Sequence, residues 1–156
     1  MSNGTNDGIK VKGSYRLQIT EDGRIVGDSG WNENQTTNLG FNWYLAGLLG
    51  GIAGSSQIGY AALGTGGVPA TGDTTLSGEV ASRAAVTAAT SSSSKAVQFT
   101  ATFSSADAFL AGTSNISNIG LFATDSGGTL FAGNTYASSS CATNQSVNVT
   151  YTISFS

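Results

Sequence analysis

The chain has 156 residues, of which only 10% are charged, with no histidine and a formal net charge of −3. Its length fits one domain, which can bury about 68–70% of the surface that the unfolded chain exposes. The acidic balance argues against a basic surface for nucleic acid, and the lack of histidine leaves few groups for acid–base catalysis, so we expect neither a nucleic-acid partner nor an enzyme.

The N-terminal residues are expected to form an extended arm. The opening residues, MSNGTNDG, lack the basic and apolar segments of a secretory signal, and no apolar run approaches the ~18 residues of a membrane span. We therefore expect a soluble protein without a membrane partner. Residues 1–12 would form the arm, and residues 13–156 a single domain.

The first strands follow from an alternation with a period of two. Tyr15, Leu17 and Ile19 alternate with polar residues, as in a strand with one buried face. Residues 21–24, with the sequence EDGR, have the chemistry of a tight turn. The sequence therefore predicts a hairpin that returns through residues 25–26.

Residues 38–52, NLGFNWYLAGLLGGI, predict the one helix of the fold. Leu39, Trp43 and Ala46 recur at helical spacing, and Asn38 can cap the first turn. The glycines after Leu49 would end the helix or loosen its last turn.

The rest of the chain is typical of short strands joined by polar turns. The apolar or alternating segments predict strands at residues 58–63, 97–103, 116–122, 129–135 and 147–155. Residues 64–70 predict a loop whose glycines adopt conformations closed to other residues, residues 125–128 a hairpin turn, and the serines at 91–94 a flexible hairpin tip. Seven or eight strands are expected in all.

The single cysteine, Cys141, lies in the polar run SSSCATNQ. It has no partner for an internal disulfide, and no histidine is present to activate it. We expect a free thiol at the surface or half-buried.

Strands that are apolar on one side must bury that side against a second layer. The sequence therefore predicts an all-β fold: an antiparallel β-sandwich, of jelly-roll or immunoglobulin-like kind, with one short helix and an extended N-terminal arm. The C-terminal strand has neither the charge nor the proline that protects an edge. We expect its edge to be covered by the helix or by a neighbouring subunit.

Two sets of residues suggest ligand-binding motifs, but their spacing matches neither a phosphate-binding nor a calcium-binding loop. Residues 64–67, GTGG, are not followed by the GK[ST] of a phosphate loop, and Asp22, Asp28 and Asp125 do not match a calcium-binding loop. We expect no catalytic residue, no cofactor and no metal site.

Seven residues are candidates for contact with a partner: Ile9, Val11, Trp31, Trp43, Tyr44, Glu79 and Arg83. Trp31 lies in a polar loop, where it is either tucked back on the domain or anchored in a partner's pocket. For Phe41, Trp43 and Tyr44, packing in the core is the favoured interpretation, with an interface on the other face of the helix as the alternative.

The candidates Glu79 and Arg83 stand four residues apart. In a strand this spacing would place their side chains on one face but too far apart for direct contact. The two could form an ion pair outside a strand, and the alternative is that each pairs with another neighbour, within the fold or across an interface.

Two motifs carry a resemblance to a known group of proteins. The matching positions are Asn38, Ala62-Leu63-Gly64-Thr65-Gly66, Pro69, Asp73-Thr74, Leu76, Glu79-Val80, Arg83, Ile116, Ile119-Gly120-Leu121-Phe122 and Thr150–Phe155. Through these motifs, roughly residues 36–156 resemble small structural proteins of tailed bacteriophages and prophages. Residues 1–30 depart from the pattern.

The resemblance implies assembly into a virion. The chain would be a capsid cement or decoration protein, a homotrimer that binds between major capsid protein subunits and stabilises the head. Its location would be the capsid surface, after assembly in the host bacterial cytoplasm. The alternative is a tail-tip, baseplate or fibre component involved in host attachment, for which Trp31 is the sole good candidate for a glycan-binding aromatic side chain.

Overall fold

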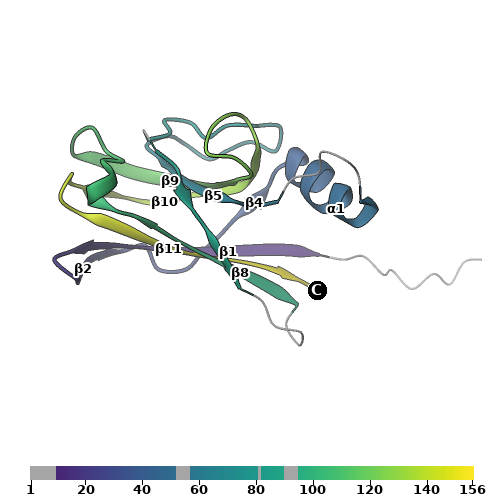
Figure 1. The fold of residues 1–156 in the computed structure, drawn as a ribbon, viewed down its shortest axis with the longest axis horizontal. Coiled ribbons are helices and arrows are strands. Elements are labelled where there is room, and N and C mark those ends of the chain that lie inside the picture. Colours follow the sequence, from purple (N-terminus) through teal and green to yellow (C-terminus); the bar gives the residue numbers. More distant parts are fainter. Residues whose placement is uncertain (1–9, 52–56, 81, 90–94) are drawn as a thin grey trace, which may run out of the picture.

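The computed structural model describes residues 10–51, 57–80, 82–89 and 95–156. Two antiparallel sheets pack face to face as a β-sandwich, and a short helical segment lies at one end (Figure 1). This confirms the all-β sandwich predicted from the alternation. Ile9, most of the expected arm and the serine tract at 91–94 fall outside the described residues.

The first sheet has the strand order β2-β1-β11-β8-β7, with β3 also paired to β1. Its strands are β1 (Val11–Glu21), β2 (Arg24–Asp28), β3 (Asn32–Glu33), β7 (Thr87–Ala89), β8 (Ala96–Phe103) and β11 (Ser146–Phe155). Val11 pairs with Phe155 and Lys12 with Ser154, so these two residues of the expected arm belong to β1.

The second sheet has the strand order β4-β10-β9-β5-β6. Its strands are β4 (Gln35–Thr36), β5 (Tyr60–Gly64), β6 (Ala84–Ala85), β9 (Ser114–Phe122) and β10 (Leu130–Cys141). A 3₁₀ turn, η2 (Ser105–Asp107), follows β8 in the chain. The eleven strands described exceed the number expected because several are only two or three residues long.

The predicted hairpin between β1 and β2 is present. Glu21 pairs with Arg24, and both loop residues have positive φ, 49° at Asp22 and 75° at Gly23. An Asp-Gly loop of this kind matches the twist of the flanking strands, because glycine adopts positive φ without a steric cost.

The C-terminal strand is not an edge. β11 lies between β1 and β8, with hydrogen-bonded neighbours on both sides over most of its length. The expectation of a C-terminal edge covered by the helix or by a neighbouring subunit is therefore wrong. The missing charge and proline reflect a central strand, which needs no such protection.

The core fills the space between the two sheets. Tyr15 and Tyr151 stack with ring centroids 5.4 Å apart, and Tyr15 donates a hydrogen bond of 2.7 Å from its hydroxyl to the carbonyl of Thr135. Cys141 belongs to this core and is 0% exposed, which corrects the expected surface thiol. Along β10 the neighbouring Ser140 side chain points outward, so the Cys141 side chain points into the core. Burial there raises the pKa of the Cys141 thiol.

Candidate interaction surface

The helical segment closes one end of the sandwich. It consists of a π-helix, η1 (Gly40–Ala46), followed by α1 (Gly47–Gly50), and it stands beside the end of the second sheet (Figure 1). The cap is Thr37 rather than the predicted Asn38, because the Thr37 hydroxyl accepts a 3.0 Å hydrogen bond from the amide of Gly40. The same hydroxyl donates to the carbonyl of Leu130 at 2.6 Å, which ties the helix start to β10.

Tyr44 holds the helix on the sandwich. Its ring packs edge-on against Phe131 with centroids 5.0 Å apart, and its hydroxyl donates to the carbonyl of Thr129. Only 2% of Tyr44 is exposed, which confirms core packing for this candidate. The start of the helix lies so close to β10 that a side chain at Gly40 would collide with the carbonyl of Phe131.

The other side of the helix is apolar and open. Phe41 and Trp43 are each 47% exposed, and Leu49 is 90% exposed. For Phe41 and Trp43 the predicted core packing is therefore wrong. Trp43 is an accessible candidate for partner contact, and three large apolar side chains on one short helix form an unusual exposed surface.

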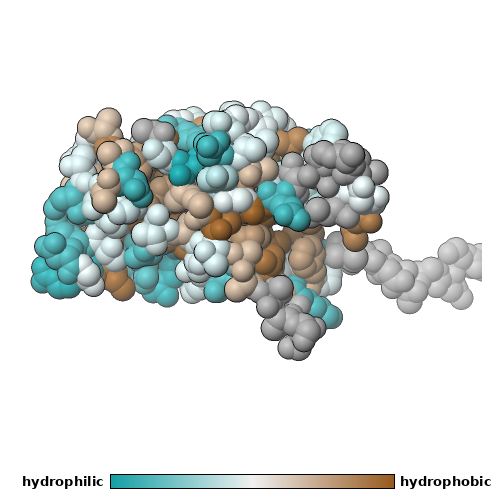
Figure 2. Space-filling model, viewed as in Figure 1, coloured by the Kyte–Doolittle hydropathy of each residue, from teal (hydrophilic) through white to brown (hydrophobic). Residues whose placement is uncertain are grey.

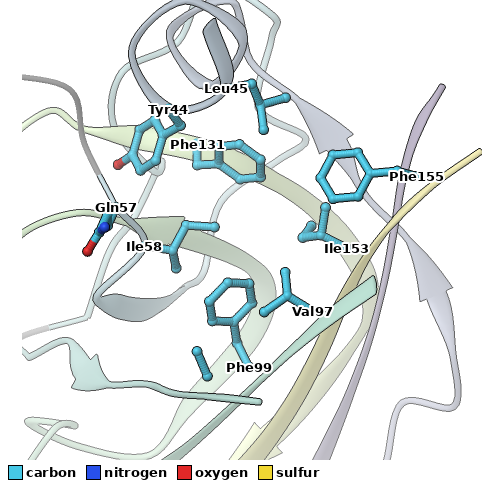
Figure 3. A pocket seen from close by; sticks show the side chains of 10 residues that line it. Tyr44, Leu45, Gln57, Ile58, Val97, Phe99, Phe131, Ile153 and Phe155 are labelled. Atoms are coloured by element: carbon cyan, nitrogen blue, oxygen red, sulfur yellow. The ribbon is translucent and has the colours of Figure 1, made fainter. Parts of the chain in front are cut away.

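Two apolar hollows flank this helix. The inner cleft, of about 320 Å³, runs between the sheets, and the side chains of Leu45, Phe131 and Phe155 converge on it with those of Ile58, Val97, Phe99 and Ile153 (Figure 3). The outer groove, of about 740 Å³, is lined by Val11, Phe41, Asn42, Tyr44, Leu45, Ala46, Leu49 and Phe155. The candidate Val11 thus lies on the wall of an apolar groove.

The chain segment that contains the helix has no charged residue. Between Glu33 and Asp73 there is no Asp, Glu, Lys or Arg. Lys12 alternates with Val11 along β1, so its side chain points to the face of the strand away from the groove. In Figure 2, hydrophobic colouring gathers toward this end, whereas the end with the β1–β2 hairpin is mostly hydrophilic.

The candidates Glu79 and Arg83 contact each other, which is the ion pair that the sequence left open and not the separation expected in a strand. The Arg83 Nε donates to Glu79 Oε1 at 2.5 Å, and Nη2 donates to Oε2 at 3.1 Å. Direct contact is possible because these residues do not lie in a continuous strand: Glu79 forms only an isolated bridge to Gly64. The Arg83 side chain is 4% exposed, so this pair is part of the fold rather than a partner surface.

Trp31 lies on a loop fixed by an exposed ion pair. The side chain is 55% exposed, which makes it accessible to a partner instead of tucked on the domain. Asp28 anchors the loop: it accepts hydrogen bonds from Arg16 Nε at 3.0 Å, from the amide of Gly30 at 2.9 Å and from Gln18 at 3.2 Å. The hydrogen bond from Arg16, followed by those from Gly30 and Gln18, lowers the pKa of Asp28 below its usual range.

This carboxylate makes the Trp31 loop sensitive to acid. Because the pKa of Asp28 is lower in the folded chain than in the unfolded chain, its contribution to stability is present above about pH 4 and is lost as the pH falls further. In a Trp43→Phe variant, where Trp31 is the only tryptophan, we expect Trp31 fluorescence to stay constant through about pH 4 and to change only well below it, as the pH falls through the lowered pKa of Asp28 in the folded chain. Adding Asp28→Asn should give the acid-like emission already at neutral pH, and an unaltered titration in that variant would contradict this role.

The sequence prediction missed Leu49 and Phe155 as residues that line the outer groove. The usable signal was the segment of residues 38–50, where large apolar residues recur on more than one side of a helix, Asn38 and Asn42 are the only side-chain amides and no residue is charged. A helix on a soluble domain normally turns its large apolar side chains to the core, so apolar residues on several sides could have marked the exposed ones for a partner.

In the part of the chain that the structure describes, no three His, Cys, Asp or Glu side chains gather closely enough to hold a metal ion. No helix among the same residues is long and apolar enough to cross a membrane. The chain matches no family model, no curated protein and no solved structure.

Proposed function

We propose that this chain is a structural protein of a bacteriophage virion, and most specifically a capsid cement or decoration protein that binds between major capsid protein subunits and stabilises the head. The observation that carries the proposal is the exposed apolar end of the sandwich, formed by the helix and the outer groove. An apolar surface of this kind on a small domain indicates a role in assembly.

The remaining surface also suits a role in assembly. The outward residues of β8 and β11 are rows of Thr, Ser, Asn and Gln, exemplified by the hydrogen bond of 3.0 Å between Thr102 and Asn148. Such faces can pack against other polar surfaces without the cost of burying unpaired charges. Repeated over many copies on a shell, individually weak contacts give strong overall binding.

The resemblance supplies the virion context of the proposal. It covers roughly residues 36–156 and implies a homotrimer on the capsid surface, assembled in the host cytoplasm. The protein acts by binding and needs no cofactor. Its partners are the major capsid protein and further copies of itself.

Trp31 favours a second candidate function, a tail-tip, baseplate or fibre component that attaches to the host. An aromatic side chain that is 55% exposed on a loop can stack on a sugar ring of a surface glycan. The two candidates differ in the target that the purified protein binds.

Rebinding to shells that lack the protein tests both candidates. For a cement protein we expect many copies bound per shell, measured by quantitative gel analysis, and a higher melting temperature of the shells by calorimetry. Trp31→Ser should leave both values unchanged. A protein that ignores shells but binds host cells or glycans, and loses that binding with Trp31→Ser, would establish the second function instead.

A further inference from the structure

The helical segment of residues 38–50 has apolar side chains on two sides. Tyr44 faces the sandwich, whereas Phe41, Trp43 and Leu49 are exposed. A surface helix normally confines its large apolar side chains to the stripe that faces the core. We infer that a second copy of this chain covers the open side, so that this helix joins copies of the protein.

The distribution of charge favours a second copy as the occupant. The residues between Glu33 and Asp73 carry no charge, and none of the residues that line the outer groove is charged. A charged partner surface would lose its hydration here without gaining an opposite charge. The same helix and groove lining of another copy, which carry no charged side chain, meet this requirement, and no like charges on the two helices oppose the contact.

The shape of the helix end also allows copies to fit together. Phe41 and Leu49 line the outer groove, whereas Trp43 does not line it and is exposed elsewhere on the helix. One copy therefore presents both a protruding indole and a concave apolar groove of about 740 Å³. Contact between copies can bury both features, because every copy carries an indole and a groove.

The exposed apolar area on the helix limits how strongly two copies can bind each other. An aromatic side chain covers about 150–250 Å², so the exposed halves of Phe41 and Trp43 offer roughly 100 Å² each. With Leu49, these side chains offer on the order of 300 Å² per copy, against about 800 Å² per partner in a standard interface. The groove lining adds to this, and the result is a weak, concentration-dependent association.

This inference deepens the proposed function, on which it rests for its role in assembly: the helix supplies the contact between copies and leaves the polar sheet faces to the shell. Weak self-association keeps free protein largely dissociated. On a shell, where copies are held close together, the same contact forms readily.

The two tryptophans provide the test in free protein. Trp31 and Trp43 have similar exposure, 55% and 47%, but only Trp43 lies on the helix. Trp31→Phe leaves Trp43 as the only tryptophan, and Trp43→Phe leaves Trp31. Between roughly 1 μM and 1 mM we expect Trp43 emission to shift to shorter wavelength and its acrylamide quenching to fall, while Trp31 is unchanged. A response from Trp31 alone would overturn the inference.

Sedimentation equilibrium of the full chain gives the second readout. We expect the average mass of the wild type to rise above 15.7 kDa with concentration, and Leu49→Gln to weaken this association about tenfold or more. Leu49 is 90% exposed, so the substitution should not disturb folding. The control is Ile25→Gln, which changes a side chain that is 58% exposed on β2 and should leave self-association intact.

The outcomes separate this inference from the proposed function. A wild type that stays monomeric throughout, or a Leu49→Gln variant that associates as the wild type does, overturns the helix contact even if shells are bound. Association through the helix together with failure to bind shells sustains the helix contact and removes the cement function.

Discussion

Replacing Arg83 by alanine is expected to lower the free energy of unfolding by about 3 kcal/mol. The guanidinium lies over the ring of Phe122, with its central carbon 3.5 Å from the ring centroid. It also donates to the carbonyls of Thr124 at 2.9 Å and Gly127 at 2.8 Å, in addition to its two bonds to Glu79. One buried side chain therefore joins the loop after β5 to the turn between β9 and β10.

The size of the Arg83 effect follows from what the substitution leaves behind. Removing one partner of a buried ion pair costs about 3–5 kcal/mol, because the other charge stays buried and unpaired. The Glu79 side chain is 24% exposed, so water relieves part of that cost and the lower end of the range applies. The two carbonyls also lose their donors, and the face of Phe122 loses its cation.

Urea unfolding of matched variants measures this effect. Arg83→Lys keeps the charge but loses the paired hydrogen bonds and the planar stacking, so we expect an intermediate loss. Arg16→Ala is the control: it removes an arginine bound to a carboxylate in a similar way, but at an exposed position where solvent screens the pair, and the unfolding midpoint should barely move. A loss below about 1 kcal/mol for Arg83→Ala would show that Arg83 does not hold these loops together.

The fold class could be predicted because the signals that define it are local. Alternation along β1, β8 and β11 places one set of side chains inward in each strand, and the observed burial follows it. The Asp22-Gly23 turn is also a local feature. The order of strands in each sheet is not local: β11 pairs with β1 across more than a hundred residues, and nothing in either strand's sequence specifies that partner.

The candidate site was predicted only in part, for a related reason. Helical spacing located the helix, but whether Trp43 faces the sandwich or the solvent depends on where Tyr44 and Thr37 attach the helix to β10. The same limit applies to Arg83 and Glu79, whose contact depends on a loop path that propensity does not encode. Local sequence patterns thus predicted the helices and strands, whereas contacts between segments distant in sequence decided which side chains are exposed.

The loop after β5 shows another such attachment, centred on Asn118. This residue is 0% exposed, and its side-chain amide donates to the carbonyls of Gly67 at 3.2 Å and Ser77 at 3.0 Å. The sequence predicted that glycines here serve unusual backbone conformations. Neither Gly64 nor Gly67 has a positive φ, and Gly64 is required instead for space.

Replacing Gly64 by alanine is expected to lower the free energy of unfolding by about 3 kcal/mol. The new methyl group would overlap the side-chain oxygen of Asn118 and lie 2.8 Å from the carbonyl of Ser77. Neither group can move freely, because Asn118 is held by its two hydrogen bonds and the Ser77 carbonyl also accepts from the amide of Gly66 at 3.1 Å. The strain therefore cannot be relieved without separating the loop from β9.

Gly67→Ala is the matched control, since nothing lies within 4 Å of its added methyl group, and we expect a change below about 0.5 kcal/mol. Urea unfolding of Gly64→Ala, Asn118→Ala and the double variant forms a cycle. Removing the Asn118 side chain removes one of the two groups that the methyl overlaps, so the double variant should lose less stability than the sum of the single variants, by about 1 kcal/mol or more. Strictly additive losses would mean that Gly64 and Asn118 do not act on each other.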